Sequence, residues 1–428
     1  MKTRFQKIKT LQKTNKAGTL VVTLLTMAII SSLAASYLSL ITSTNMSTIR
    51  SMAWNNAVPV LEAGIEEAMA HLNKNGSGSL AADGWSASSG GYVKSFQIGT
   101  NGSYVSTTIT PSGTTPVIES KGYVRVPLKT STYVTRTVRV NTKLDALYAK
   151  GLVAKGQINL NGNNIRVDSF DSQDSAYSTS GQYDAAKYKE NGDVATNSQL
   201  VNSLNVGNAE IYGDVSSGPG GSVAVGSQGF VTGTVSDDMN VSFPDVSAPT
   251  GSMSTPASGT VNGTAYTYVL SSGSYIINGN LSLSGNTQRI LVTGDAVLYV
   301  TGDVSLAGQS YIQVGSSGSL KMYVAGASTS IGGQGVMNSA ANASKFAYYG
   351  LPTNTSVSFS GNAAFTGTIY APSAALSLGG GGSNTYDFVG SAIASTATLN
   401  GHYNFHYDEM LGRTGTSRGY VATSWNEL

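Results

Sequence analysis

The stretch GTLVVTLLTMAIISSLAASYLSLI (residues 18–41) contains no charged residue. At about 1.5 Å per residue, a helix of this length crosses the roughly 30 Å hydrocarbon core of a bilayer. Six basic residues precede it: Lys2, Arg4, Lys7, Lys9, Lys13 and Lys16. By the positive-inside rule, they predict a cytoplasmic N-terminus and an extracytoplasmic remainder. Because the apolar region of a cleaved secretory signal is about 7–15 residues long, we expect this longer helix to be retained.

The composition of the chain limits its class. It has 428 residues, a formal net charge of +2, only 11% charged residues, 51 glycines and no cysteine. The length is enough for two or three domains. Charge this weak provides no general attraction to nucleic acid, so we expect no nucleic-acid partner. The absence of cysteine excludes a disulfide framework and thiolate metal sites.

The helical pattern continues beyond the apolar run. Apolar and small residues recur at spacings of three and four, at Met46, Ile49, Ala53, Ala57, Val60, Gly64, Ala68 and Leu72. This spacing places them on one face of an α-helix. The sequence NKNG (73–76) is a stop signal. We therefore predict one helix over residues 19–76, membrane-embedded in its first half and amphipathic in its second.

The segments KAGTLVVTLLTMAII (16–30) and AVPVLEAGIEEAMAHL (57–72) resemble the N-terminus of PilX-type minor pilins and related type IV pilin-like proteins. The resemblance implies that a prepilin peptidase removes the basic leader, residues 1–18, by cutting between Gly18 and Thr19. It also implies a helix-end motif. The motif residues are Glu62, Gly64, Glu66 and Glu67.

The resemblance further implies an inner-membrane protein whose helix packs against other pilin-like subunits, with incorporation into a pilus at the cell surface. One departure concerns the fifth mature position, where major pilins carry Glu and this chain has Thr23. This difference affects the expectation of processing and filament entry. The alternative is a plain signal-anchor helix with a juxtamembrane extension.

The chain after the helix changes to strand patterns. Residues 77–90 form a Gly/Ser-rich linker. Residues 91–144 alternate apolar and polar side chains in runs that Gly and Pro separate, which predicts a small antiparallel sheet of about four strands. The apolar stripe of the preceding helix needs a partner, and this sheet is the nearest candidate.

A short phrase recurs in residues 145–428. Its variants are GQINLNGN (156–163), GNLSLSGN (279–286), GDVSLAGQ (302–309) and SVSFSGNA (356–363), and the series is extended by GNAEIYGDV (207–215), GTIYAPSAALSL (367–378) and STATLNGH (395–402). Short strands with Gly and Asn corners are typical of a parallel β-helix, in which each turn is stable only when stacked on the next. A β-sandwich or jelly roll is the competing fold. We expect loop insertions near residues 173–204 and 235–262.

This region also resembles the β-solenoid domain that follows pilin-type anchors in surface proteins of Gram-negative bacteria. The segments that carry the resemblance are LYAKGLVAKGQINLNGNNIRVDSFDS (147–172), TGTIYAPSAALSL (366–378) and NFHYDEML (404–411). That domain has no assigned activity, so the resemblance concerns architecture. The predicted fold class is thus mainly β, with a long transmembrane α-helix, a small antiparallel sheet and a C-terminal parallel β-helix.

Two groups of polar residues are candidates for glycan or metal binding. Asp168 and Asp171 lie in VDSFDSQDSAYSTSGQYD, where carboxylates on one face would serve calcium or acid–base chemistry. Their spacing does not match the calcium-loop motif, and Asp commonly forms turns with its own backbone. His402 and His406 lie in GHYNFHYDEML, a spacing that favours zinc. The helical zinc motif is absent, however, so we interpret this stretch as the aromatic final turn that closes the solenoid.

These patterns favour a non-enzymatic surface protein that acts in type IV pilus or pseudopilus assembly and in adhesion. We expect no metal or cofactor, and surface glycans are candidate ligands. A tethered polysaccharide lyase or hydrolase on a β-helix is one alternative. A structural component of the envelope without a ligand is the other.

Overall fold

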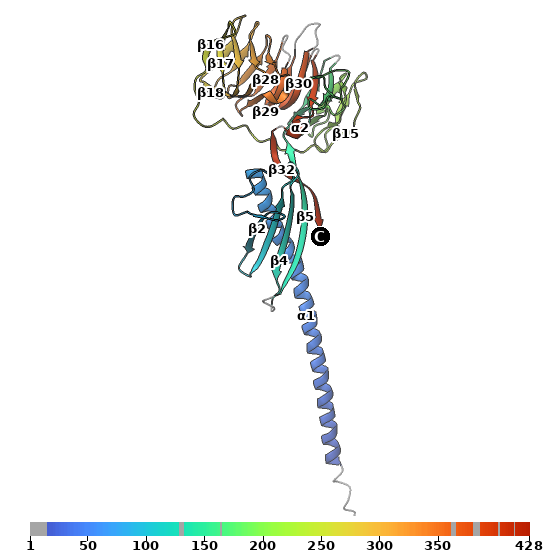
Figure 1. The fold of residues 1–428 in the computed structure, drawn as a ribbon. Helices are drawn as coiled ribbons and strands as arrows, with labels where there is room; N and C mark the ends of the chain where they lie inside the picture. Colours follow the sequence, from blue (N-terminus) through green and yellow to red (C-terminus); the bar gives the residue numbers. More distant parts are fainter. Residues whose placement is uncertain are drawn as a thin grey trace, which may run out of the picture. The chain divides into compact units, whose positions relative to one another are not determined.

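The computed structural model describes residues 15–127, 132–162, 165–360, 365–379, 386–400, 403–414 and 416–428. These residues form two compact units (Figure 1). Unit 1 contains the chain up to Leu144 together with Gly419–Leu428, and unit 2 contains Asp145–Arg418. Most of the basic leader predicted over residues 1–18 lies outside the described residues.

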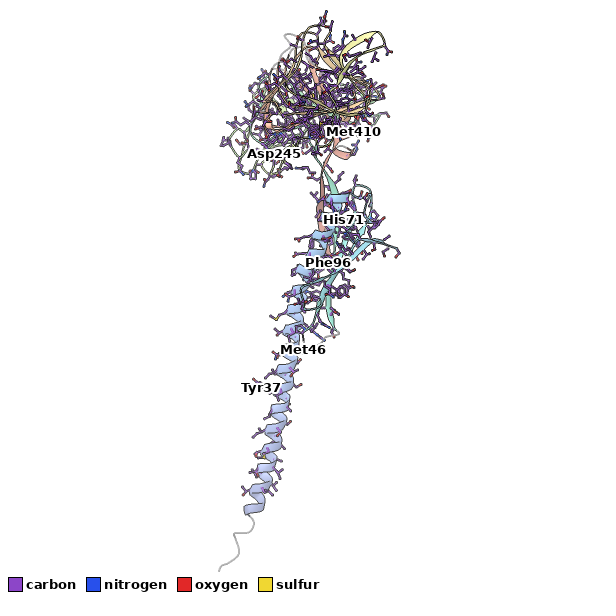
Figure 2. The ribbon with its side chains drawn as sticks, turned by 90° about the vertical axis from the view of Figure 1, so that its left-hand side faces the viewer. Tyr37, Met46, His71, Phe96, Asp245 and Met410 are labelled. Carbon is purple, nitrogen blue, oxygen red and sulfur yellow. The ribbon has the colours of Figure 1, made fainter. Side chains whose placement is uncertain are left out.

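Unit 1 is built on α1 (Asn15–Asn75), a single helix of 61 residues that continues through Pro59. Its first half is apolar and exposed, and Figure 2 shows Tyr37 on this part of the helix. Its second half buries the stripe that the spacing predicts, including Ala57, Leu61, Ala68 and Leu72. The long helix is therefore confirmed, and its first half packs on no other described residue of unit 1.

Sheet A of unit 1 covers the second half of α1. Its strands are β1 (Ser86–Ser88), β2 (Gly91–Ile98), β3 (Ser103–Thr110), β4 (Val117–Arg125), β5 (Tyr133–Ala146) and β32 (Ser417–Glu427), in that spatial order. The pairs from β1 to β5 are antiparallel. β3 and β4 alternate buried and half-buried residues, because one face of each strand packs on α1. The predicted antiparallel sheet is confirmed.

The C-terminal segment corrects the predicted domain boundary. The prediction assigned all of residues 145–428 to the solenoid, but Gly419–Leu428 belong to unit 1. β32 lies beside β5, and the Leu428 backbone N–H donates to the Thr137 carbonyl at 3.0 Å. The Arg136 guanidinium donates two hydrogen bonds of 2.7 Å to the Glu427 carboxylate. An edge strand leaves backbone groups unpaired, and β32 satisfies those of β5.

Unit 2 is a solenoid of short parallel strands, which confirms the predicted β-helix. In its first part the strands are β6 (Leu152–Ala154), β7 (Ile158–Leu160), β8 (Arg166–Phe170), β9 (Val194–Thr196), β10 (Leu204–Gly207), β11 (Glu210–Ile211), β12 (Val215–Ser216), β13 (Val223–Val225), β14 (Phe230–Val231) and β15 (Val235–Ser236). The predicted insertion at 173–204 therefore contains β9 and the start of β10.

The second part of unit 2 contains longer strands. They are β16 (Ala257–Val261), β17 (Thr264–Leu270), β18 (Gly273–Ile277), β19 (Leu281–Leu283), β20 (Arg289–Val292), β21 (Asp295–Val300), β22 (Val304–Leu306), β23 (Tyr311–Val314), β24 (Ser319–Val324), β25 (Ser328–Ile331), β26 (Val336–Asn338), β27 (Phe346–Gly350), β28 (Ser356–Phe359), β29 (Phe365–Leu378), β30 (Tyr386–Leu399) and β31 (Tyr403–Asp408). Two short helices, η1 (Ala343–Lys345) and α2 (Leu411–Thr414), complete the unit.

Each turn of the solenoid, here called a rung, has three strand positions. β17–β19, β20–β22, β23–β25 and β26–β28 are successive rungs, and β29 and β30 each pass through a whole rung. Six of the seven segments of the series occupy the third position: β19, β22, β28, the ends of β29 and β30, and β7 stack in parallel register through β25. The seventh, GNAEIYGDV (207–215), instead holds β11 at the first position. The apolar residues of the six form one column of the core, which explains why the phrase recurs.

The chain enters the solenoid in its middle. β31, β6 and β7 together stack on β30 and form one rung from two distant parts of the sequence. β8–β15 continue the stack to one end, and β16–β18 lie at the other end (Figure 1). The prediction that GHYNFHYDEML closes the solenoid is therefore wrong, because β31 lies between β30 and β8. A composite rung leaves no chain end at that position to be capped.

Residues 237–253 contain no strand and connect the two ends of the solenoid. Met239, Phe243 and Val246 are buried there, in the same apolar cluster as Tyr370 and Ile393. The Tyr370 hydroxyl donates to the Pro244 carbonyl at 2.7 Å. The connection thus lies along the outer side of the second strand position. It accounts for most of the loop predicted at 235–262, which also holds β15 and β16.

Candidate functional site

The structure brings two of the predicted site residues together. Asp168 lies on β8 and His406 lies on β31, where the parallel register places them side by side. Both are buried. Asp171, just after β8, points into a separate ion pair, and His402 lies outside the described residues. The pair that forms was not predicted, because the sequence separates its members by 238 positions.

Three donors surround the Asp168 carboxylate. Its Oδ1 lies 2.5 Å from Nδ1 of His406. Its Oδ2 accepts hydrogen bonds of 2.7 Å from Nε of Arg166 and from the Tyr183 hydroxyl. Because Asp168 has no exposed surface, these three donors take the place of water around its carboxylate. We name Asp168, His406, Arg166 and Tyr183 the inner cluster.

Residues 172–193 form a loop that covers the inner cluster. The Tyr183 ring from this loop stacks on the His406 ring, with centroids 3.5 Å apart and 20° between the planes. The Arg166 guanidinium lies over the rings of Tyr188 and Tyr212, at 4.3 and 4.6 Å. Stacked cation and aromatic groups gain strength when they are removed from water. The loop therefore contributes to burying the ion pair that fastens it.

The charges around His406 determine its protonation. Burial alone lowers the pKa of His406, but the hydrogen bond to Asp168 and the nearby Asp387 carboxylate outweigh burial and raise it. Oδ1 of Asp387 lies 3.4 Å from Nε2 of His406. Burial alone raises the pKa of the Asp387 carboxyl. The hydrogen bond and the charge of the His406 imidazole outweigh burial, so the pKa is lowered. Opposite charges within a few ångströms favour both ionised forms.

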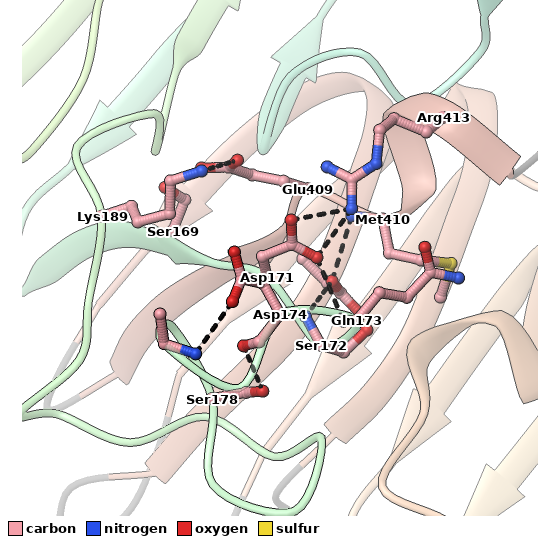
Figure 3. A network of polar contacts seen from close by, with 12 residues as sticks. Ser169, Asp171, Ser172, Gln173, Asp174, Ser178, Lys189, Glu409, Met410 and Arg413 are labelled. Carbon is pink, nitrogen blue, oxygen red and sulfur yellow. Dashed lines mark hydrogen bonds and ion pairs between the residues drawn. The ribbon is translucent and has the colours of Figure 1, made fainter.

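A second polar network lies next to the inner cluster, where β31 leads into α2 (Figure 3). The Arg413 guanidinium donates two hydrogen bonds of 2.7 Å to Asp171. The Lys189 ammonium pairs with Glu409, which also accepts from the Ser169 hydroxyl at 2.9 Å. These contacts tie both ends of the 172–193 loop to β31 and α2. We name this set the outer network.

Asp408 is the least compensated carboxyl of the region. Its Oδ1 accepts from the backbone N–H groups of Ser172 and Met410, at 3.1 and 3.2 Å. Its Oδ2 is buried without a hydrogen-bond partner. Burial raises its pKa, although the hydrogen bonds from Ser172 and Met410 act in the opposite direction. The carboxyl fixes the turn after β31.

The polar groups of this region bond to one another and hold the covering loop in place. Each oxygen of Asp168 is occupied by a group of the protein, and the covering loop excludes solvent. Among the described residues, no group of three or more His, Asp or Glu side chains is arranged to hold a metal ion. A cavity of about 170 Å³ elsewhere in unit 2 is lined by Tyr148, Lys321 and Tyr349, among others, and contains none of the predicted site residues.

Sequence reasoning missed Arg166, Tyr183 and Asp387. Arg166 carries a readable signal, because it precedes Asp168 by two positions on the same strand and so shares its face. Asp387 aligns with Asn404 through the register of β30 and β31. Tyr183 lies in the irregular loop and has no local signal. Recognition of these residues requires the stacking order of the rungs.

The helix-end residues have separate roles in unit 1. A Cβ added to Gly64 would lie 2.2 Å from the Thr107 Oγ1 and 2.5 Å from the Ser120 Oγ, so the glycine allows close approach of helix and sheet. Glu67 forms an ion pair of 2.5 Å with Lys94. Glu62 and Glu66 are exposed.

The proposed processing site lies near the start of α1. Gly18 and Thr19 are both helical and exposed. Nothing lies within 4 Å of the position that a Cβ of Gly18 would take. The segment Gly18–Asn75 is long and apolar enough, by length and composition, to cross a membrane.

Residues 245–414 match a family model. The family is described as a domain of unknown function (DUF7305). The match begins in the connection between the solenoid ends and runs through β31 and α2, so it covers the second part of unit 2 and only the β31 portion of the composite rung. It leaves out unit 1 and β6–β15.

No curated protein matches the chain. Among solved structures, the competence-associated pilin ComZ from Thermus thermophilus is similar at 11% sequence identity. The alignment covers 88% of this chain and 98% of that chain, with a TM-score of 0.21. A TM-score this low carries no argument about fold or function.

Proposed function

We propose that the protein is a membrane-anchored, pilin-like bacterial surface protein that acts in type IV pilus or pseudopilus assembly and in surface adhesion. The observation that carries the proposal is the division of α1 into two halves. The first half exposes Leu20, Ile30 and Leu38 at 64, 64 and 62%. Such a surface needs lipid or other helices as a partner. The second half is covered by an antiparallel sheet.

The proposal assigns one kind of partner to the first half of α1 and another to the solenoid. The first half of α1 lies in the inner membrane and packs laterally against other pilin-like subunits. The solenoid projects on the extracytoplasmic side. It offers its long, weakly charged surface to glycans or partner subunits, in line with the 11% charged residues of the chain.

We propose a binding role for the protein and no catalysis. The support is the geometry of the inner cluster, where Asp168 is fully buried and bonded to His406, Arg166 and Tyr183. A catalytic carboxylate has to reach its substrate, directly or through one water. Asp171 is likewise engaged, by Arg413.

Leader processing tests the proposal through the intact mass of the membrane-extracted protein. With a co-expressed prepilin peptidase, the mass should decrease by that of residues 1–18, leaving Thr19 as the N-terminus. Without the peptidase, or in a Gly18→Val variant, the full mass should remain. An unchanged mass under all conditions would leave a plain signal anchor. Cleavage near Ala35 would identify a secreted protein instead.

A further inference from the structure

One end of the solenoid is open. Its last rung, residues 218–236, contains β13, β14 and β15, each of which pairs with one strand only among the described residues. The backbone N–H groups of Phe230 and Thr232 donate to the Ala209 and Ile211 carbonyls of the preceding rung. The other edge of this rung faces away from the stack. We name the rung and its free edge the open end.

Burial also indicates that the stack stops without a cap. In the rung before the last, Ile211 and Val215 have no exposed surface. In the last rung, Val223 and Val231 only partly close over the same core. Repeat proteins require capping repeats with a polar outer face to remain soluble on their own. Among the residues that the structure describes, none forms such a cap on the open end.

The opposite end of the solenoid is protected at two of its three strand positions. There β16 folds back antiparallel on β17, which ends the parallel edge at the first strand position. Ser254 pairs with β18, since its N–H donates to the Ser274 carbonyl and its carbonyl accepts from the Ile276 N–H. Covering an edge strand is a common protection against unwanted pairing. The two ends therefore differ, because β13, β14 and β15 all keep a free edge, whereas at the opposite end only β19, paired with β22 alone, keeps one among the described residues.

The last rung contains no charged side chain and exposes large apolar residues, and the first charges after it are the exposed Asp237 and Asp238, directly beyond β15. Residues 218–236 contain no Asp, Glu, Lys, Arg or His. Val225, Phe230 and Val235 are exposed by 45, 37 and 57%. Leu200 and Val201, in the adjoining turn of the preceding rung, are exposed by 61 and 76%. Charged side chains are the usual protection of a free strand edge, and none is present on this rung.

We propose that the open end binds the open end of a second copy of this chain about a two-fold axis. In a two-fold contact every residue near the axis meets its own copy, so charges there repel. A rung without charges has no such repulsion. The opposite end is covered at its first and second strand positions, which prevents head-to-tail stacking of a whole rung. A two-fold axis across the solenoid axis would also set β14 antiparallel to β14 of the second copy, so that both free edges are paired.

The absence of cysteine provides a direct test in the full-length protein. Single variants Val225→Cys, Phe230→Cys and Val235→Cys are expressed in the native membrane and treated with a mild oxidant or a short bis-maleimide. We expect at least one of them to form a covalent homodimer. A charge should prevent it: adding Val231→Lys to the cross-linking variant should lower the yield about tenfold or more, because it places like charges together.

Thr260→Cys, exposed on β16 at the covered end, is the matched control. Association through α1 brings all positions of two copies near each other, so equal yields at Thr260 and at the open end would overturn the proposal. No homodimer at any of the three positions would also overturn it. Cross-links to a different protein in place of a homodimer would also contradict the proposal, because another occupant would then cover the same edge. None of these outcomes depends on leader processing.

Discussion

Replacement of Asp168 by asparagine is expected to destabilise unit 2 by about 3–5 kcal/mol, because it leaves buried positive charge without its partner. The carboxylate accepts from three donors, at His406, Arg166 and Tyr183. An asparagine in the same place offers one acceptor oxygen, and its NH2 group faces a donor on the other side. Shape is kept and charge is lost, so the change isolates the electrostatic role.

The measurement follows unfolding of each unit with its own signal. The three tryptophans, Trp54, Trp85 and Trp425, all lie in unit 1. In denaturant titrations of the full chain in detergent, Asp168→Asn should shift the circular-dichroism transition of the β-rich unit 2 and leave the tryptophan transition in place. Asp174→Asn, at an exposed turn carboxylate, is the matched control. Equal stability of the two variants would contradict the role of the inner cluster.

The effect of Asp168→Asn should depend on pH. The pKa of His406 is raised in the folded protein, so its protonated form stabilises the fold. This stabilisation is complete below the unfolded pKa of about 6.5 and is lost as the pH rises through the higher folded pKa. The difference between wild type and variant should therefore be largest below about pH 6.5 and should shrink above it. Arg166 keeps its charge, so part of the difference should remain.

Replacement of Gly64 by valine is expected to destabilise unit 1 by about 2–3 kcal/mol through overpacking. The added Cβ would lie 2.2 Å from the Thr107 Oγ1 and 2.7 Å from Cγ2 of Val105, closer than atoms approach. It would also disturb the buried Ser120 hydroxyl, which donates to the Leu61 carbonyl at 2.8 Å. The helix would have to move away from the sheet.

Tryptophan fluorescence reports this change, because Trp85 is buried in the core between α1 and sheet A. Ala70→Val, on the exposed side of the same helix, is the control for the lower helix propensity of valine. Gly64→Val should shift the tryptophan transition and leave the transition of unit 2 unchanged. A shift no larger than that of Ala70→Val would show that the close approach of helix and sheet is not required.

Periodicity was enough to predict the elements of this fold. The apolar stripe from Ala53 to Leu72 predicted the packed face of α1, and the repeated phrase predicted a column of parallel strands. Both depend on local spacing, which a single sequence displays directly. The order in which the rungs stack does not depend on local spacing. The phrase at β7 stacks on the end of β30 although the chain enters at β6, and nothing local records that junction.

Long-range pairing explains the remaining differences between prediction and structure. β32 completes sheet A beside β5, so residues after Arg418 leave the solenoid although their alternation suits either sheet. Asp168 and His406 meet only because β31 and β8 share an interface of the composite rung. Residue type was therefore enough to select Asp168 and His406 as candidates, but the sequence did not show that they are partners.

The most direct test of the account is the side of the membrane on which unit 2 lies. A single cysteine introduced as Ser258→Cys, at an exposed position of β16, is treated with a membrane-impermeant maleimide in spheroplasts. We predict labelling in intact spheroplasts equal to that after detergent lysis, with the protein in the membrane fraction. Labelling that requires lysis, or a protein found in the soluble fraction, would contradict a membrane anchor with an extracytoplasmic solenoid.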